Sequence, residues 1–210
     1  KVEDGCNRRC AYCVIPRARG PVRSRDEASV LEELRRLSDA GYKEVVLTAI
    51  SLPSYGTDSG TSLVELIEKA AEVPGIERIR LGSLDPDMLH DEDILRMAGV
   101  KKLCPQFHLS LQSGCDKTLR AMRRPYTTAQ YADIAAKLRE AFGAEKVSFT
   151  TDVIVGFPGE TEEDFEASMA FVTGMQFLKV HVFPYSRREG TAAYDFPGQV
   201  PEHEKESRSR

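Results

Sequence analysis

The sequence predicts an α/β protein whose parallel sheet curls into a partial (β/α)6 TIM-like barrel with outer helices. Short apolar runs recur roughly every 30 to 40 residues, which is the size of one βα unit. Helical patterns fill the gaps between these runs, and such alternation indicates a parallel sheet with right-handed crossovers. A closed eight-unit barrel usually takes about 250 residues. The 210 residues of this chain therefore fit a smaller, partly closed barrel.

The predicted strands are rich in β-branched and aromatic residues. They cover 44–48, 77–81, 106–111, 147–155 and 178–183, and residues 1–3 are expected to end a further strand. Between them, apolar residues recur at helical spacing, with threonines before some stripes and glycines after others. The stripes are Val30–Leu37, Leu63–Ala70, Ile94–Met97, Tyr131–Phe142 and Phe165–Val172. Leu95 and Met169 are expected on the buried faces of their helices.

The composition is that of an ordinary globular protein, with 41% hydrophobic and 30% charged residues. The net charge of −4 gives no overall basic signature of nucleic-acid binding, although arginines gather near the start of the chain. No apolar run approaches about 18 residues, and no secretory leader is apparent. Neither a membrane partner nor secretion is therefore expected. Five cysteines, some of them bunched, favour a reducing, cytoplasmic location over a disulfide framework.

The segment "GCNRRCAYC" carries the most specific chemistry of the sequence. Cys6, Cys10 and Cys13 are spaced C-x3-C-x2-C directly after the first predicted strand. Thiolates suit zinc, copper(I) or iron–sulfur clusters, and a cluster held by three cysteines would leave one iron open to a ligand. A structural zinc site needs a fourth ligand, for which Cys104 and His108 are the candidates. A redox-active pair would use only the two cysteines of the C-x2-C spacing and would give Cys6 no role. The spacing favours the cluster and leaves zinc and redox thiols as alternatives.

Unusual segments follow the predicted strands. They are "GCNRRCAYC", "TAISLPSYG", "GSLDP", "LQSG", "GFPGET" and "FPYSRREGT". Because the carboxyl ends of parallel strands meet at one edge of a sheet, active sites form there. We therefore expect these loops to converge on one site, while His108 and His181, within predicted strands, line the barrel or its core.

Several segments resemble a known family. C-x3-C-x2-C with an aromatic residue before the last cysteine, here Tyr12, is similar to the signature of the radical S-adenosylmethionine (SAM) superfamily. The segments "EDGCNRRCAYCVIPRARGPVRSR", "HLSLQSGCDKTLRAMRRPYT", "TTDVIVGFPGETEEDF" and "VHVFPYSRREGTAA" resemble its methylthiotransferase branch in order and spacing. The resemblance covers nearly the whole chain and is greatest to the tRNA enzymes that thiomethylate N6-threonylcarbamoyladenosine. Enzymes acting on isopentenyladenosine or on a ribosomal-protein aspartate resemble it a little less.

The resemblance implies a radical mechanism. Cys6, Cys10 and Cys13 would ligate a [4Fe–4S] cluster, and the amino and carboxylate groups of SAM would chelate its open iron. One electron from a reductant such as flavodoxin or ferredoxin would split SAM, and a 5′-deoxyadenosyl radical would take hydrogen from C2 of the adenine beside the anticodon. Sulfur would be installed there, with a methyl group from a second SAM. No side chain is assigned a catalytic role. A ribosomal-protein methylthiotransferase is one alternative, and a non-catalytic zinc or iron–sulfur binding module is another.

Side chains near the cysteines and the fourth strand suit SAM binding. Tyr12 can offer apolar cover to an adenine, and Gln112 and Ser113 can hydrogen-bond ribose hydroxyls. Gly114 permits a close turn at this point. The alternative for Gln112 is that it satisfies buried backbone groups.

The later strands supply further candidates. Asp152 is a polar residue in an otherwise apolar strand, and Arg124 is a fixed cation suited to a carboxylate, with a plain surface charge as its alternative. The backbone from Phe183 to Tyr185 can pair with an adenine edge. The turn from Gly156 to Gly159 leads into a helix, and its amides can face a negative group or belong to an ordinary turn.

Arginines continue beyond the cysteine segment, at Arg17, Arg19, Arg23 and Arg25. Arginine is a common ligand of RNA phosphates. We therefore expect these residues to contact the tRNA substrate, with a solvated loop as the alternative.

The sequence departs from the family in two respects. "LTAISLPSYG" lacks the glycine and histidine usually found near Ala49 and Ser51, where the strand end normally contacts the SAM amino group. The family also carries an N-terminal domain with an auxiliary cluster and a C-terminal RNA-binding β-barrel, and no segment here matches either. We expect residues 1–210 to form one radical SAM core domain from a longer protein. Such a piece is expected to bind a cluster but not to complete thiomethylation.

Overall fold

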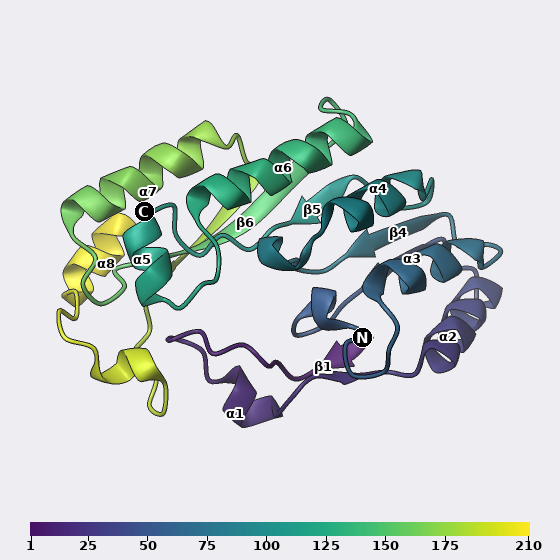
Figure 1. Ribbon diagram of the computed structural model, residues 1–210, viewed down its shortest axis with the longest axis horizontal. Helices are drawn as coiled ribbons and strands as arrows, with labels where there is room; N and C mark the ends of the chain where they lie inside the picture. Colours follow the sequence, from purple (N-terminus) through teal and green to yellow (C-terminus); the bar gives the residue numbers. More distant parts are fainter.

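The computed structural model describes residues 1–210 as strands flanked by an arc of helices (Figure 1). The strands are β1 (Glu3–Asp4), β2 (Arg23–Ser24), β3 (Glu44–Leu47), β4 (Arg78–Leu81), β5 (Gln106–His108), β6 (Ser148–Val155) and β7 (Lys179–Pro184). The helices are α1 (Ile15–Arg19), α2 (Glu27–Asp39), α3 (Leu63–Glu72), α4 (Asp91–Gly99), α5 (Asp116–Ala121), α6 (Thr128–Phe142), α7 (Glu162–Gly174) and α8 (Glu202–Arg208). None of these helices combines the length and the apolar character needed to span a membrane.

The five strands from β3 to β7 form an open parallel layer in chain order. β3 pairs with β4, and β6 lies between β5 and β7, all in parallel. A parallel bridge between Leu84 and Leu109 joins the two groups just beyond the ends of β4 and β5. β7 has only β6 as a neighbour, so the sheet does not close into a ring. The predicted α/β class, with a partial barrel and outer helices, is therefore confirmed.

Burial along β6 explains how the sheet presents polar groups. Buried and half-buried residues alternate strictly along this strand, as expected when successive side chains point to opposite faces. Phe149 and Val153 belong to the main apolar core, whereas Thr150, Asp152 and Ile154 are half-buried on the other face. The inner face of the barrel is therefore partly polar and open, while the helices cover the apolar face.

The predicted helices are present, with two corrections to the faces that they bury. Thr127 and Thr161 form capping boxes at the starts of α6 and α7. Leu95 is 68% exposed and Met169 is 49% exposed, so neither belongs to the core. In α7 the buried position is Ser168, whose hydroxyl accepts a hydrogen bond from the Gly114 amide at 2.8 Å. Close approach of the Gly114 backbone explains why a small residue lies at that point of contact.

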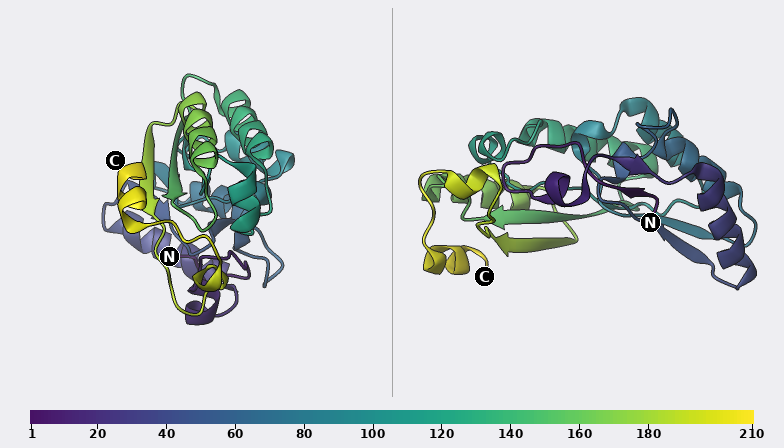
Figure 2. Two further views of the ribbon diagram at one scale, coloured as in Figure 1. Left: turned by 90° about the vertical axis from the view of Figure 1, so that its left-hand side faces the viewer. Right: turned by 90° about the horizontal axis from the view of Figure 1, so that it is seen from below.

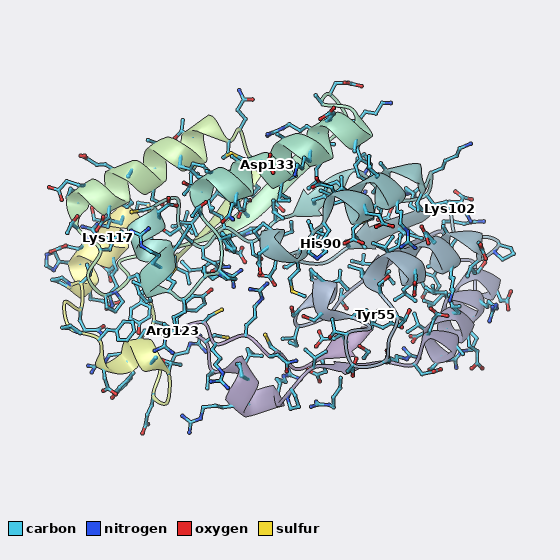
Figure 3. The ribbon with its side chains drawn as sticks, in the orientation of Figure 1. Tyr55, His90, Lys102, Lys117, Arg123 and Asp133 are labelled. Carbon is cyan, nitrogen blue, oxygen red and sulfur yellow. The ribbon has the colours of Figure 1, made fainter.

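Exposed charges on the outer helices contrast with the buried interior (Figure 3). The side chains of Lys117 and Asp133 are more than half exposed, whereas Tyr55, which follows a turn packed against α3, is 1% exposed. This arrangement is the ordinary one for helices that cover a sheet on one side.

The two ends of the chain differ from expectation. The first residues do not form a long barrel strand, because β1 spans two residues and pairs antiparallel with β2. Val2 still donates a backbone hydrogen bond to Thr48 at 2.8 Å, which holds the segment beside the end of β3. The charged run near the C-terminus carries no predicted element, yet it forms α8, which lies beside β7 (Figure 2).

Candidate functional site

The cysteine segment is an irregular loop whose two ends are tied together. β1 enters the loop and β2 leaves it, and the Cys6 amide donates to the carbonyl of Gly20 at 3.1 Å. Gly5 has a φ of 89°, and a Cβ at this position would overlap the carbonyl oxygen of Pro21. A glycine is therefore required where the loop closes.

A small apolar cluster holds the middle of this loop. The Ala11 amide donates to the Met122 carbonyl at 2.9 Å, and the Ala11 carbonyl accepts from the Ala193 amide at 2.8 Å. Ala11, Met122, Phe157, Tyr185 and Ala193 are all buried and pack together. These interactions fix Tyr12 and Cys13, the next residues along the chain, at the mouth of the sheet.

A pocket of about 530 Å³ opens at the carboxyl ends of the last three strands. This volume falls within the usual range for a small-molecule site, about 300–1,000 Å³. Its wall contains Cys13 together with five residues predicted to bind a cofactor: Tyr12, Gln112, Asp152, Phe183 and Tyr185. The structure thus brings the cysteine loop and the ends of β6 and β7 to one cavity, as expected from the topology.

Aromatic rings form one side of this region. Phe157 packs edge-on against Tyr12 and Tyr185, with ring centroids 6.5 Å and 5.3 Å apart. Burial is the main cause that raises the pKa of the Tyr12 hydroxyl well above its usual range. Tyr12 therefore stays neutral and provides an apolar surface rather than a proton-transfer group.

Gln112 reaches the pocket from an unusual backbone conformation. Its φ is 69°, a region that residues other than glycine seldom adopt. Its backbone is nevertheless held beside β6, because the Gln112 amide donates to the Asp152 carbonyl at 2.9 Å and the Gln112 carbonyl accepts from the Ile154 amide at 2.8 Å. Strained backbone of this kind is often found at functional sites.

Asp152 joins the pocket to the inner face of the barrel. Its carboxylate lies 3.4 Å from Nε2 of His108, whose Nδ1 lies 3.0 Å from the hydroxyl of Thr150. The ring of His181 lies beside that of His108, with centroids 6.2 Å apart. The two histidines line the inner face, consistent with the expectation from their strands.

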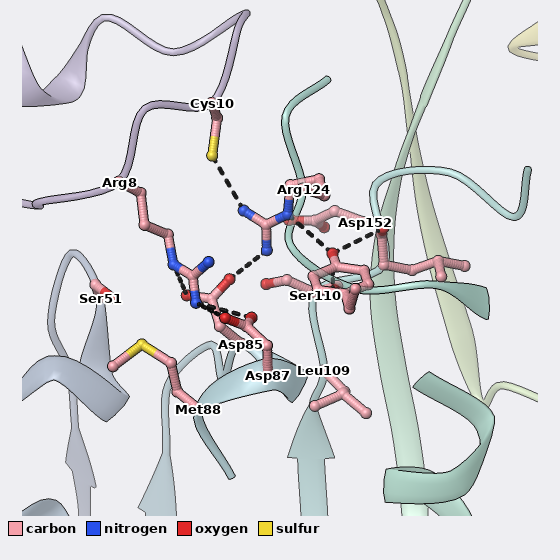
Figure 4. A network of polar contacts seen from close by, with 12 residues as sticks. Arg8, Cys10, Ser51, Asp85, Asp87, Met88, Leu109, Ser110, Arg124 and Asp152 are labelled. Carbon is pink, nitrogen blue, oxygen red and sulfur yellow. Dashed lines mark hydrogen bonds and ion pairs between the residues drawn. The ribbon is translucent and has the colours of Figure 1, made fainter. Parts of the chain in front are cut away.

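A second group of charges lies beside the pocket at the ends of β4 and β5 (Figure 4). Arg124 donates to Cys10 Sγ at 3.2 Å and pairs with Asp85, while Arg8 lies 3.4 Å from Asp85 and 2.8 Å from Asp87. Each cation here faces a carboxylate, so the charges neutralise one another. Sequence reasoning missed Asp85 and Asp87 as individual residues, although "GSLDP" follows a predicted strand and that position was the available signal.

Two predicted cofactor ligands lie away from the pocket wall. Arg124 is 8% exposed and is held by Cys10, Asp85 and the Tyr126 hydroxyl, so the carboxylate it meets belongs to the chain itself. The alternative of a surface charge is wrong. Ser113 is 1% exposed, and its hydroxyl accepts from the Cys115 amide at 3.2 Å. Their roles toward a cofactor stay predictions.

In the glycine turn after β6, the amides of both glycines are used within the chain. The Gly156 amide donates to Glu160 at 2.7 Å, and the Gly159 amide donates to Gly198 at 2.8 Å. Arg208 then lies 2.9 Å from the same Glu160 oxygen. The negative group at this turn is therefore a side chain of the protein.

The positions that depart from the family pattern lie outside the pocket. The amides of Ile50 and Ser51 donate to Glu3 at 3.1 and 2.9 Å, and the Ser51 hydroxyl lies 2.8 Å from that of Ser54. Ala49 packs against the main core. These groups are thus used within the chain.

The four arginines beyond the cysteines divide into two kinds. Arg19 and Arg23 are about half exposed and approach Asp4 at 3.4 and 4.0 Å. Arg17 is exposed, and it donates to the Gly190 carbonyl at 2.8 Å. Arg25 instead pairs with Glu33 and bonds to residue 29, which ties it to α2. Only the first three present an exposed basic surface, and RNA binding there stays a prediction.

The thiols suit the cluster implied by the resemblance. Cys6, Cys10 and Cys13 are free and half-buried on a single loop, and burial is the main cause that raises the pKa of Cys6 and Cys13. No three His, Cys, Asp or Glu side chains converge as ligands of one metal ion. Cys104 precedes β5, at the amino end of the sheet, and Nδ1 of His108 lies 3.0 Å from the hydroxyl of Thr150 in β6. Neither residue therefore completes a zinc site at the loop. Soft donors beside an open pocket match a cluster with an accessible iron.

Curated proteins similar to this chain include enzymes of tRNA modification. It is 43% identical over 201 residues to the threonylcarbamoyladenosine tRNA methylthiotransferase MtaB of Chlamydia pneumoniae, covering 96% of this chain and 47% of that protein. It is 42% identical over 206 residues to the tRNA-2-methylthio-N(6)-dimethylallyladenosine synthase of Acetivibrio thermocellus, covering 97% of this chain and 42% of that protein. The chain thus spans about half the length of the curated relatives it matches.

The fold and the sequence pattern agree with these relatives. The radical SAM methyltransferase TsrM of Kitasatospora setae, solved with cobalamin and a [4Fe-4S] cluster, superposes with a TM-score of 0.74 at 18% identity, over 91% of this chain and 37% of TsrM. At that identity the likeness shows the fold alone. The pattern of the Radical SAM superfamily matches residues 2–172. The chain therefore belongs to the radical SAM superfamily.

Proposed function

We propose that this chain is the SAM-cleaving core of a tRNA methylthiotransferase. One observation carries the proposal: Cys13 of the three-cysteine loop lines the same cavity as five residues predicted to bind a cofactor. The likeness to curated methylthiotransferases over nearly the whole chain supports it.

The cysteine loop would hold the cluster, and residues of the cavity wall would hold SAM. Cys6, Cys10 and Cys13 would hold the [4Fe–4S] cluster, which supplies the electron that splits SAM when both are bound. Tyr12 would cover the adenine, and Gln112 would reach the ribose hydroxyls. Fixed groups of this kind limit where a reactive fragment of SAM can go, and such positioning is a large part of catalysis.

The substrate we propose is N6-threonylcarbamoyladenosine beside the anticodon of tRNA, with activation at C2 of the adenine. Relatives named for this nucleoside and for dimethylallyladenosine match the chain about equally well, so the choice rests on the resemblance of "LSLQSG", "MRRPYT" and "HVFPYSRREGT". We propose flavodoxin or ferredoxin as the class of reductant. Complete thiomethylation would require the auxiliary-cluster and RNA-binding domains expected in the whole protein.

The first test is SAM cleavage by the chain after anaerobic reconstitution with iron and sulfide. Reduced protein is expected to form 5′-deoxyadenosine, and Cys13→Ala is expected to lose both cluster absorbance and product. Cys104→Ala is the matched control, because Cys104 lies at the opposite end of the sheet. A colourless protein that binds one zinc and forms no 5′-deoxyadenosine would contradict the proposal.

A second test identifies the acceptor. Deuterium at C2 of the modified adenine is expected to appear in 5′-deoxyadenosine when the matching tRNA is supplied. The same assay with isopentenyladenosine-containing tRNA and with a ribosomal-protein peptide deuterated at the target aspartate separates the alternatives. Transfer from the peptide alone would replace the tRNA proposal by the ribosomal-protein one.

A further inference from the structure

The helix α8 buries charged residues that none of the preceding roles uses. Lys205 is 6% exposed, and the side chain of Arg208 is 8% exposed, although both lie in a seven-residue helix with a highly charged sequence. Burial of a lysine is costly unless its ammonium group is paired and hydrogen-bonded. The partners of these two side chains therefore point to a role for the helix.

Lys205 reaches the two strand ends that form the pocket wall. Its Nζ donates to the Tyr185 carbonyl at 3.2 Å and to Glu202 at 2.9 Å, and it lies 5.7 Å from the centre of the Tyr185 ring. Its aliphatic stem crosses Gly156, where a Cβ would overlap Lys205 Cγ. Gly156 has a φ of 70°, so both its conformation and this close approach require glycine.

Hydrogen bonds on both sides hold the backbone at Tyr185. Its amide donates to the Val155 carbonyl at 2.8 Å, and its carbonyl accepts from Lys205. Neighbouring Pro184 has no N–H to donate and a restricted φ. The segment Phe183–Tyr185, which lines the pocket, is therefore fixed on one side by β6 and on the other by α8.

Arg208 fixes the neighbouring turn from the same helix. It lies 2.9 Å from both Glu160 and Glu162, and Glu160 in turn accepts from the Gly156 amide. Burial is the main cause that raises the pKa of Glu160, while the Gly156 amide and Arg208 act in the opposite direction. Helix α8 thus holds the ends of both β6 and β7.

We propose that Lys205 is a positioning residue for the adenine side of the SAM pocket. By holding the Tyr185 carbonyl, it sets the backbone from Phe183 to Tyr185 at the distance from Tyr12, across the pocket, that an adenine ring requires. This inference rests on the proposed function, because it assumes that the pocket binds the adenosyl group. Lys205 acts through Tyr185 and does not itself line the pocket.

Lys205→Met tests the role, because methionine keeps the length of the stem and removes the ammonium group. The probe is SAM, titrated into the reduced, reconstituted chain while the electron paramagnetic resonance signal of the cluster is followed. Removal of a charged hydrogen bond typically corresponds to about a tenfold change in an equilibrium constant. We expect the SAM concentration at half-saturation to rise about tenfold, with an unchanged signal at saturation and unchanged iron content.

Two companion variants separate positioning from stability. Lys101→Met removes an exposed lysine from another part of the chain and is expected to leave half-saturation unchanged. Lys205→Arg keeps a donor for the Tyr185 carbonyl and is expected to restore much of the affinity that Lys205→Met lacks. Amide exchange is expected to increase in the peptide 179–189 of Lys205→Met, measured well below its melting temperature.

The outcomes are distinct. A Lys205→Met protein that melts at a lower temperature but saturates with SAM at the original concentration would overturn the positioning role and leave the proposed function intact. If Lys205→Met does not fold, Lys205→Gln decides by the same titration, because its shorter, neutral side chain ends one bond short of the Tyr185 carbonyl. An affinity of Lys205→Gln for SAM no lower than that of the unaltered chain, together with unchanged exchange at 179–189, overturns the role. An unaltered chain whose cluster signal does not respond to SAM would overturn the proposed function, and this inference with it.

Discussion

Two regions at the same edge of the sheet use polar residues in opposite ways. At the ends of β4 and β5, Arg8 and Arg124 face Asp85 and Asp87, and the four charges neutralise one another. At the ends of β6 and β7, Asp152 lines an open cavity, and its carboxylate lies 3.4 Å from Nε2 of His108. The first region is satisfied within the chain, whereas the second leaves polar groups available to a ligand.

The cysteine loop connects these regions. Cys10 Sγ accepts a hydrogen bond from Arg124 in the charge network, and Cys13 belongs to the wall of the pocket. We infer that the network holds the loop in place while the pocket accepts the ligand. Substitutions in the network should therefore affect folding most, and substitutions in the pocket should affect binding most.

The largest effect is expected for Arg124→Met. The change would leave Asp85 buried without its main partner, and breaking such a pair costs about 3–5 kcal/mol of folding free energy. Urea unfolding measures this decrease in stability. The double variant Arg124→Met with Asp85→Leu is expected to recover much of the stability, because no uncompensated charge remains. A single variant as stable as the unaltered chain would show that the network does not support the fold.

Gly5→Ala should come next, and it tests whether the loop depends on its closure. Alanine at this positive φ, with its Cβ against the Pro21 carbonyl, is expected to cost about 3 kcal/mol and to lower the iron retained after reconstitution. Gly41→Ala is a suitable control, since Gly41 also has a positive φ but nothing lies within 4 Å of a Cβ there. Equal destabilisation of the two variants would mean that backbone strain alone, without the overlap at Pro21, accounts for the effect.

Asp152→Asn should separate binding from folding. Its side chain is 34% exposed, so the folding free energy is expected to change by no more than about 0.5 kcal/mol. The SAM concentration at half-saturation is expected to rise about tenfold, because asparagine cannot make the charge-assisted hydrogen bond of the carboxylate. A large shift of the urea midpoint with unaltered SAM binding would reverse the assignment of the two regions.

The smallest effect is expected on the exposed basic surface. Replacing Arg17, Arg19 and Arg23 by glutamine should reduce the salt dependence of tRNA binding, with the log–log slope falling by roughly 0.7–0.9 for each phosphate that an arginine no longer neutralises. Arg25→Gln is the matched control, because Arg25 is paired with Glu33. An equal effect from the control would place RNA binding along the whole segment.

Local patterns were sufficient for much of the fold. The β-branched and aromatic residues of 147–155, the capping threonines of α6 and α7, and the spacing of the cysteines are all short-range features, and the strand and both helices that they predict are present. Short-range features are readable because strand and helix periods and capping bonds involve residues a few positions apart. The prediction that Met169 lies on the buried face of α7 was wrong, because the face that this helix buries depends on where Gly114 approaches it.

The sequence by itself determined the family, because its motifs resemble those of known members, and it determined the order of the strands along the chain and the set of thiols, because these follow from spacing. Tertiary structure alone decided which charged side chains find partners within the chain and which stay available to a ligand. Arg124 meets Asp85 from 39 residues away, and Lys205 meets Tyr185 from 20 residues away. Pairing across such separations depends on how strands and helices pack, and the free energy of a buried charge depends on the partner that packing supplies.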